Sequence, residues 1–102
     1  MNINVEVKET ERYFHVYVEG EVDVYTAPKL HGRLLPLTEE PKSNIVVDLS
    51  GVVYLDSVGL GVFINILNKV SSQDGTLKIV GLSERLHKLF SITGIVDIMN
   101  VK

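Results

Sequence analysis

The stretch IVVDLSGVVYLDSVGLGVFINIL (residues 45–67) contains two hydrophobic patterns that meet at Asp56-Ser57. Before this junction the apolar residues are nearly consecutive, which is typical of a β-strand covered on both faces. The Ser50-Gly51 pair predicts a turn inside that apolar run. After the junction the apolar residues recur at helical spacing, which predicts a helix that ends at Asp74-Gly75. The apolar positions of this helix are Leu60, Phe63, Ile64, Leu67 and Val70.

Two strands and a helix are expected before this stretch. Apolar and polar residues alternate over residues 3–7 and 14–18, which is the period of a half-buried strand. A short polar turn separates the two runs, so they predict a hairpin. A helix follows, because Thr26 can cap a helix start and Pro28 suits a first turn. Pro36 should kink this helix or end it early.

A strand and a helix are expected after the central stretch. The strand is predicted around Leu77–Val80, and Ser83 should cap a third helix that closes near Gly94. A short segment, Ile95–Met99, completes the chain. The order is β-β-α-β-α-β-α, an α/β fold in which helices cover a small mixed four-stranded sheet, made of an N-terminal hairpin and parallel strands. A chain of 102 residues has the size of one domain.

Composition excludes several classes of function. The chain has no cysteine, which excludes disulfides, thiolate nucleophiles and zinc–thiolate sites. The longest apolar runs have four residues, whereas a membrane span needs about 20, and no signal-peptide pattern is present, so we expect a cytoplasmic protein. The net charge of −3 argues against nucleic acid as a partner. Residues 1–24 hold six acids, which form either a solvated edge or a surface for a basic protein.

Ser57 is expected at the cap of the central helix, where its hydroxyl can accept a hydrogen bond from a free backbone N–H. The same position has a second interpretation. The amino end of a helix is partly positive and tolerates a phosphate, which adds about −1.5 to −2 charges. Asp56 beside it would make a phosphorylated surface still more negative. A kinase could therefore turn a neutral contact at Ser57 into a repulsive one without unfolding the domain.

The helix predicted after Ser57 contains two glycines and two apolar residues that call for an explanation. Gly59 and Gly61 lie in its first turn, where each glycine costs about 1 kcal/mol relative to alanine. This cost indicates a close approach to the helix backbone, by the sheet, by another helix or by a partner protein. Val62 and Ile66 lie off the main apolar stripe. The helix is therefore either deeply buried, or it presents an apolar strip to a partner.

Catalytic and metal sites find little support in the sequence. Gly59-Leu60-Gly61 lacks the third glycine of a dinucleotide-binding loop, because that position is Ile64. The three histidines have no spacing that suggests a base for Ser57 or a metal pair. We therefore expect no catalytic residue, no resident metal and no cofactor. A weak magnesium site, or a solvated acidic rim, could still form from the aspartates near predicted strand ends, which are Asp23, Asp48 and Asp56.

Three segments resemble the STAS domain family: Gly20–Asp23, Val47–Val52 and Asp56–Gly61. The Asp-Ser-x-Gly-Leu-Gly element is quite specific when it follows an Asp-Leu-Ser-Gly strand end, as it does in this chain. Within the family, Glu21–Pro28 and Leu82–Leu86 are most similar to the stand-alone anti-sigma factor antagonists of the sigma-B, or general stress response, type. The resemblance covers nearly the whole chain and implies a single STAS domain over residues 1–102.

This resemblance implies a regulatory function. Antagonists of this kind bind an anti-sigma factor that is also a serine kinase, and binding releases the sigma factor for transcription. The kinase phosphorylates the motif serine, here Ser57, and the modified protein lets go until a PP2C-type phosphatase restores it under stress. Family members often carry Thr or Ala after this serine, whereas Val58 leaves Ser57 as the only acceptor in the motif. The residues expected to meet the partner are Asp23, Thr26, Asp56, Ser57, Val58, Gly59, Leu60, Gly61, Val62 and Ile66.

Two other classes of function stay open at this point. Some STAS-like domains bind a small ligand, a nucleotide or a lipid, inside a transporter or a trafficking complex. The third hypothesis is an enzyme that uses Ser57 as its nucleophile, for which the sequence offers no base. The antagonist hypothesis, by contrast, predicts a monomer that has no catalytic activity of its own.

Overall fold

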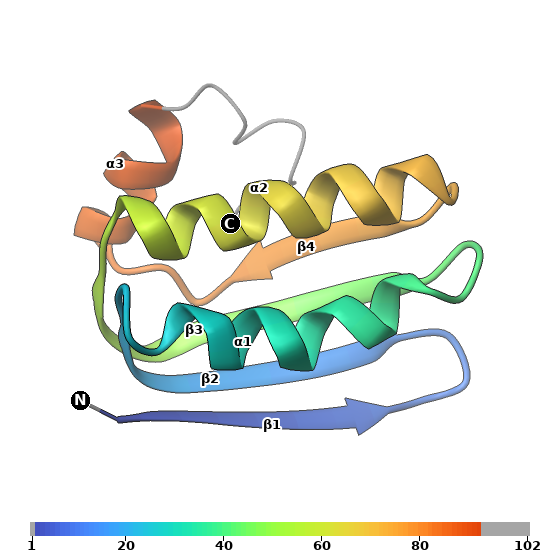
Figure 1. Ribbon diagram of the computed structural model, residues 1–102, viewed down its shortest axis with the longest axis horizontal. Helices are drawn as coiled ribbons and strands as arrows, with labels where there is room; N and C mark the ends of the chain where they lie inside the picture. Colours follow the sequence, from blue (N-terminus) through green and yellow to red (C-terminus); the bar gives the residue numbers. More distant parts are fainter. Residues whose placement is uncertain (1, 93–102) are drawn as a thin grey trace.

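The computed structural model describes residues 2–92, and it has the predicted order β-β-α-β-α-β-α (Figure 1). The first α-helix ends at Leu34, and a short 3-10 helix, η1, follows it and contains Pro36. The early helix end expected at this proline is therefore confirmed. Gly94 and Ile95–Met99 lie outside the described residues. The elements are β1 (Ile3–Glu9), β2 (Phe14–Val22), α1 (Ala27–Leu34), η1 (Leu35–Thr38), β3 (Asn44–Leu55), α2 (Ser57–Ser72), β4 (Thr76–Val80) and α3 (Glu84–Ile92).

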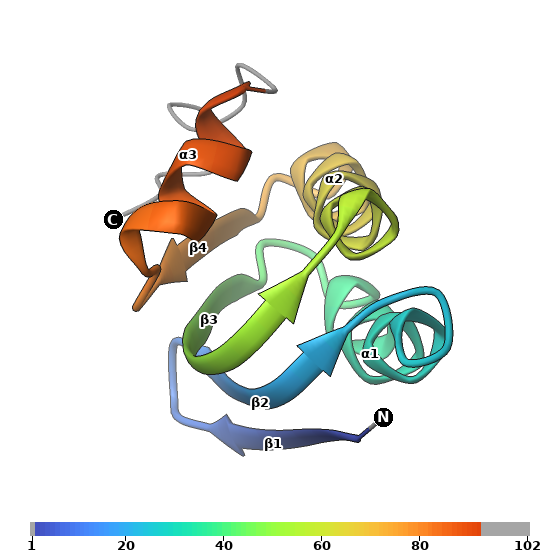
Figure 2. The same cartoon turned by 90° about the vertical axis from the view of Figure 1, so that its left-hand side faces the viewer.

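The four strands form one mixed sheet in the order β1-β2-β3-β4, as predicted. β1 pairs antiparallel with β2, whereas β2, β3 and β4 run parallel. Figure 2 shows α1 and α2 side by side on one face of this sheet. α3 packs onto α2 through Phe63 and Phe90, whose ring centroids are 5.9 Å apart. The carboxyl ends of the three parallel strands therefore share one edge, and α1, α2 and α3 all follow from that edge.

β3 differs from its prediction in two ways. Its residues alternate between buried and half-buried from Ile45 to Leu49, so the expectation of cover on both faces is wrong. The strand is also continuous through Ser50-Gly51, where a turn was predicted. Here the Ser50 N–H donates to the Asp48 carboxylate at 2.8 Å, and the register with β2 shifts. The pair is therefore an irregularity within a paired strand, like a β-bulge, and pairing with β2 keeps the chain extended.

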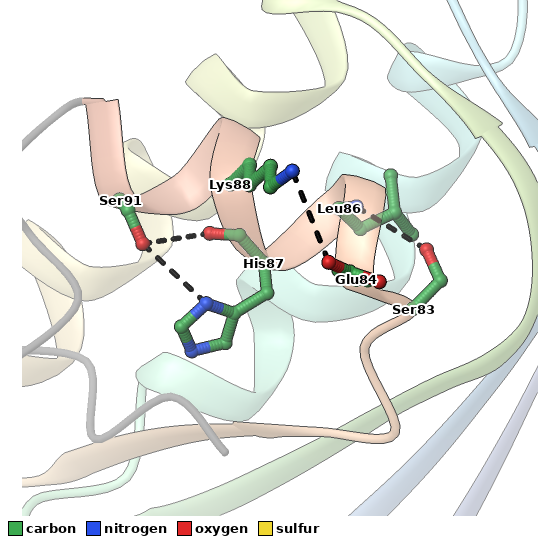
Figure 3. Close-up of polar contacts among 6 residues, drawn as sticks. All are labelled: Ser83, Glu84, Leu86, His87, Lys88 and Ser91. Atoms are coloured by element: carbon green, nitrogen blue, oxygen red, sulfur yellow. Dashed lines mark hydrogen bonds and ion pairs between the residues drawn. The ribbon is translucent and has the colours of Figure 1, made fainter.

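The start of α3 agrees with its prediction. The Leu86 N–H donates to the Ser83 hydroxyl at 3.2 Å, which is the expected cap (Figure 3). An exposed ion pair between Glu84 and Lys88 follows one turn later, at 3.8 Å. Ser83 thus ends the connection from β4 and begins the helix that packs against α2.

The free edge of the sheet at β1 is covered by two cations from α1. Lys29 Nζ donates to the Ile3 carbonyl and Arg33 Nη1 to the Val5 carbonyl, both at 3.1 Å. The two bases are four residues apart on the helix, and their acceptors are two residues apart on the strand. These spacings correspond to similar distances, about 6 Å along the helix and about 7 Å along the strand. Occupied edge carbonyls are a poor template for pairing with a second chain.

Candidate functional site

Asp56, not Ser57, caps α2. Its backbone is extended, and its Oδ1 accepts hydrogen bonds from the N–H groups of Val58 at 3.0 Å and Gly59 at 3.1 Å. The prediction that Ser57 is the cap is therefore wrong by one residue. A carboxylate at this position bonds two amides at once, and its charge is favourable at the positive end of a helix. The Asp56 N–H in turn donates to the Val22 carbonyl at 3.3 Å, which anchors the junction to β2.

Ser57 is left as the first residue of α2, exposed to solvent. Among residues 2–92, its hydroxyl forms no side-chain hydrogen bond, because the cap that it could have supplied comes from Asp56. An exposed and unengaged hydroxyl at a positive helix end is accessible to a phosphoryl donor. The site thus keeps the feature that the phosphorylation hypothesis needs, although the reason for it differs from the expected one.

The loop after β2 is held by a buried aspartate. The Asp23 Oδ1 accepts from the N–H groups of Tyr25 at 2.8 Å and Thr26 at 3.0 Å. The Thr26 hydroxyl accepts from the Asp23 N–H at 3.0 Å and donates to the Glu21 carbonyl at 2.7 Å. Thr26 precedes α1 but forms no side-chain cap, so that part of its prediction is wrong. Its side chain instead closes the loop back onto β2.

The second carboxylate oxygen of Asp23 has no hydrogen-bond partner in the part of the chain that the structure describes. The residue is only 4% exposed, so water cannot solvate this oxygen fully. Leaving a buried acceptor unsatisfied costs about 1–3 kcal/mol, and more when it is charged. Nearly all buried polar atoms have a partner, so this oxygen is an exception among the side chains that the structure describes.

The two glycines of α2 have different surroundings. A Cβ atom on Gly59 would lie 2.6 Å from Val22 Cγ1 and 3.2 Å from the Val22 carbonyl oxygen. Close packing between helix and sheet, one of the three explanations offered for the two glycines, therefore applies to Gly59. A Cβ atom on Gly61 would meet nothing within 4 Å. Gly61 is exposed, so only the approach of another molecule would require a glycine there.

Three large residues predicted to meet a partner are buried in the core. Leu60 and Val62 are 6% and 8% exposed, and Ile66 is fully buried. The proposed apolar strip of Val62 and Ile66 is therefore wrong, and the alternative of deep burial holds. Because α2 lies between α1 and α3, its apolar residues are covered on more than one side. In this structure these side chains pack in the core and help to position the start of α2.

Exposed apolar side chains lie in the segments that meet at the junction, and of these the sequence analysis named only Val58. Tyr25 is 81% exposed, although it is aromatic and lies in a loop held by three hydrogen bonds. An apolar pair between Asp23 and Thr26, where a turn is usually polar, was the available signal. Apolar side chains grouped on a surface mark contacts with other molecules. We call this group the apolar rim; it consists of Val24, Tyr25, Val53, Tyr54 and Val58.

The segments that build the site are acidic. Residues 13–28 and 43–68, which include β2, β3 and most of α2, contain no lysine or arginine. They contribute Asp23 and Asp56 at the junction itself. Asp48 lies farther back along β3, and residues 2–92 contain no cluster of three side chains able to hold a metal ion. Asp23 is buried, whereas Asp48 and Asp56 are half-buried, so the three aspartates do not form one solvated rim.

The three histidines lie apart from Ser57 in their contacts. His31 Nε2 is 2.8 Å from the Asn65 amide oxygen, which links α1 to α2. His87 is paired with Ser91 within α3 (Figure 3). Within residues 2–92, no histidine forms a hydrogen bond with Ser57, so none is placed there as a base.

No helix within these residues is long and apolar enough to cross a membrane.

Comparison with known proteins identifies the family. The STAS domain family matches residues 4–102. The anti-sigma-B factor antagonist of Bacillus subtilis (strain 168) is 48% identical over 101 residues, which are 99% of this chain and 92% of the relative. The crystal structure of an anti-sigma factor antagonist from Mycobacterium paratuberculosis has a TM-score of 0.85 at 27% identity, covering 98% of this chain and 85% of that one.

A second solved structure extends the likeness in fold. The Bacillus cell fate determinant SpoIIAA in its phosphorylated form has a TM-score of 0.69 at 14% identity, covering 90% of this chain and 85% of that one. At this identity the likeness concerns the fold alone. The family match over residues 4–102 and the relative with 48% identity show more than the fold. The chain belongs to the STAS domain family and, within it, to the family of the anti-sigma-B factor antagonists.

Proposed function

We propose that this protein is an anti-sigma factor antagonist controlled by phosphorylation of Ser57. Its unmodified form binds an anti-sigma factor with serine kinase activity and so releases a sigma factor. Phosphorylation of Ser57 ends that binding, and a PP2C-type phosphatase restores it. The observation that carries this proposal is the exposed Ser57 hydroxyl, which stands at a helix end already capped by Asp56. The curated relatives support the antagonist role through their names.

The surface offered to the anti-sigma factor combines apolar contact with one buried acceptor. The apolar rim supplies exposed side chains from Val58, from the end of β3 and from the loop after β2, a strand whose last residue is hydrogen-bonded to Asp56. The free oxygen of Asp23 supplies a carboxylate acceptor beside it. Because this oxygen is buried in the unbound protein, the loop at Val24-Tyr25 must move before a lysine or arginine of the partner can form a charge-assisted hydrogen bond with it. We therefore infer that the partner presents an apolar surface with a cation at its centre.

We further infer that the protein acts as a monomer in the cytoplasm, without a catalytic role and without nucleic acid or membrane as a partner. The cations that occupy the β1 edge, Lys29 and Arg33, favour the monomer because they oppose pairing of two sheets. The acidic charge of −3 favours a protein partner over nucleic acid.

A displacement assay tests the antagonist role directly. The purified anti-sigma factor from the same organism is saturated with its sigma factor, and the unphosphorylated protein is added without ATP. We expect free sigma factor and a new complex of this protein with the anti-sigma factor in size-exclusion chromatography or native mass spectrometry. If the sigma factor stays bound at every concentration of the added protein, the antagonist role is wrong.

Tyr25 should be a main contact of the complex. Replacing it in the Tyr25→Ala variant is expected to weaken binding to the anti-sigma factor at least about 30-fold, since buried aromatic anchors contribute about 2 kcal/mol or more. Tyr17→Ala is the matched control, because Tyr17 is also an exposed tyrosine of the β2 region but lies outside the apolar rim. Isothermal titration calorimetry measures both variants. Equal losses in the two would show that the rim is not the contact.

A small-ligand function has one observation in its favour. A hollow of about 640 Å³ lies near the amino ends of β3 and β4, and its lining includes Tyr13, His15 and Asn44. Ser57 is not among the residues that line it. An NMR titration with a nucleotide or a short-chain lipid tests this function. Shifts confined to the hollow would support a ligand site that is independent of the phosphorylation switch.

A further inference from the structure

The geometry points to Asp56 as a positioning residue that keeps a phosphoryl group on Ser57 away from the helix amides. The phosphoryl group then extends from the surface instead of binding within the protein. This inference rests on the proposed function only in taking Ser57 as the modified residue. It concerns how the modified site is arranged, which neither the family nor the relatives' names specify.

The amides at the start of α2 are already occupied. Free N–H groups at a helix start ordinarily bind phosphate, and an α-helix leaves four of them. In α2, Val58 and Gly59 donate to Asp56 Oδ1, and the Asp56 N–H donates to the Val22 carbonyl. Only the N–H of Ser57 itself remains of the four. A phosphoryl group on Ser57 would have to displace the Asp56 carboxylate to gain the other amides.

The neighbouring charges do not compensate a phosphoryl group. Asp56 adds a negative charge one residue away, and Asp23 follows the strand end to which Asp56 is hydrogen-bonded. The nearest bases of α1, Lys29 and Arg33, are engaged with β1 at the other side of that helix. α3 begins at the same sheet edge and carries Arg85, which is exposed and forms no ion pair within residues 2–92. Arg85 is therefore the one cation that the test must examine.

An extended phosphoryl group has two functional consequences. Its charge faces the anti-sigma factor, because the amides of Val58 and Gly59 stay bonded to Asp56 and do not neutralise it. It is also open to a phosphatase, which must reach the phosphorus atom to transfer the group to water. The cap that Asp56 supplies thus favours both the release of the partner after phosphorylation and the later removal of the phosphoryl group. Without Asp56, the vacant amides would hold the phosphoryl group against the protein.

The test uses protein in which phosphoserine is installed at position 57 during synthesis, so that no kinase or partner is needed. Two variants separate the charge of Asp56 from its hydrogen bonds. Asp56→Asn removes the charge but keeps an oxygen that accepts from the two amides. Asp56→Ala removes both and vacates the amides. Arg85→Ala in the otherwise unchanged chain examines the remaining cation.

Two NMR measurements read the arrangement. In the wild-type chain, the amide protons of Val58 and Gly59 should not follow the titration of the phosphoryl group, because they stay bonded to Asp56. The second pKa of the phosphoryl group, followed by phosphorus NMR, should be lower in Asp56→Ala than in Asp56→Asn, by roughly one unit or tenfold in proton affinity. A purely structural role of Asp56 would change stability without separating these two pKa values.

Three results would overturn the inference. Amide protons of Val58 and Gly59 that titrate with the phosphoryl group in the wild-type chain would show that the phosphate takes the amides despite Asp56. Equal pKa values in the Asn and Ala variants would show that the amides do not matter. A raised pKa in Arg85→Ala would show that Arg85 holds the phosphate. The amide measurement on the wild-type chain decides the question even if Asp56→Ala does not fold. All of these measurements use the isolated protein, so they stay interpretable if the antagonist role is wrong.

Discussion

Phosphorylation of Ser57 is expected to weaken binding of the anti-sigma factor roughly a thousandfold, which corresponds to about 4 kcal/mol. Exposed ion pairs contribute only about 0–1 kcal/mol, so a change at the border of the contact could not produce this effect. A phosphoryl group inside the contact must lose water next to Asp56, and like charges that face each other in an interface cost several kcal/mol. The Ser57→Ala variant should bind as tightly as the unmodified protein and should stay bound in the presence of ATP.

The control for charge alone is phosphoserine at the opposite end of the same helix. Ser72 is exposed at the last position of α2, roughly 22 Å from Ser57 at 1.5 Å per residue. Its modification adds the same charge to the protein but lies far from the junction. Calorimetric titration of the two phosphoproteins should show a loss for Ser57 only. Similar losses in both would mean that net charge, and not the position of Ser57, governs binding.

Gly59→Ala is expected to destabilise the fold by about 1–3 kcal/mol, whereas Gly61→Ala should stabilise it by up to about 1 kcal/mol. Both changes add one methyl group to the first turn of α2. At Gly59 the new Cβ would overlap Val22, whose Cγ1 would be 2.6 Å away. Valine has little freedom about χ1, so the helix start must move away from β2. At Gly61 the methyl group meets open space and alanine has the better helix propensity.

Urea unfolding followed by circular dichroism measures both free energies under the same conditions. Opposite signs for the two variants are the expected result. Destabilisation of the same size at both positions would contradict the close packing of Gly59 on Val22. Binding gives a second comparison, because Gly61→Ala should reduce affinity only if the partner approaches the exposed helix backbone at Gly61.

The element order could be predicted because each strand and helix carries its own hydrophobic period. The alternation over residues 3–7 and 14–18 led to β1 and β2, and the spacing after Ser57 led to α2. The continuity of β3 could not be predicted in this way. Ser50-Gly51 has the local composition of a turn, and only pairing with β2 holds it extended. The half-exposed face of β3 was missed because Val46 is apolar and still lies only partly covered.

The candidate site was predicted to the right segment but not to the right contacts. Asp and Ser are almost equal as helix caps, so local sequence alone does not choose between Asp56 and Ser57. The choice follows from the hydrogen bond of Asp56 to Val22, which joins residues far apart in the chain. The burial of Ile66 likewise depends on how α1 and α3 pack around α2. The exposure of Tyr25 depends on the loop that Asp23 closes, which no periodicity encodes.

The most direct test of the phosphorylation switch is the mass of the protein as its own cells make it. The native protein is purified from unstressed and from stressed cells, its intact mass is measured, and any modified peptide is sequenced by mass spectrometry. We predict an added phosphoryl group of about 80 Da on Ser57 in unstressed cells, and its decrease under stress. A protein that is unmodified in both states, or modified on a serine other than Ser57, would contradict the proposed switch.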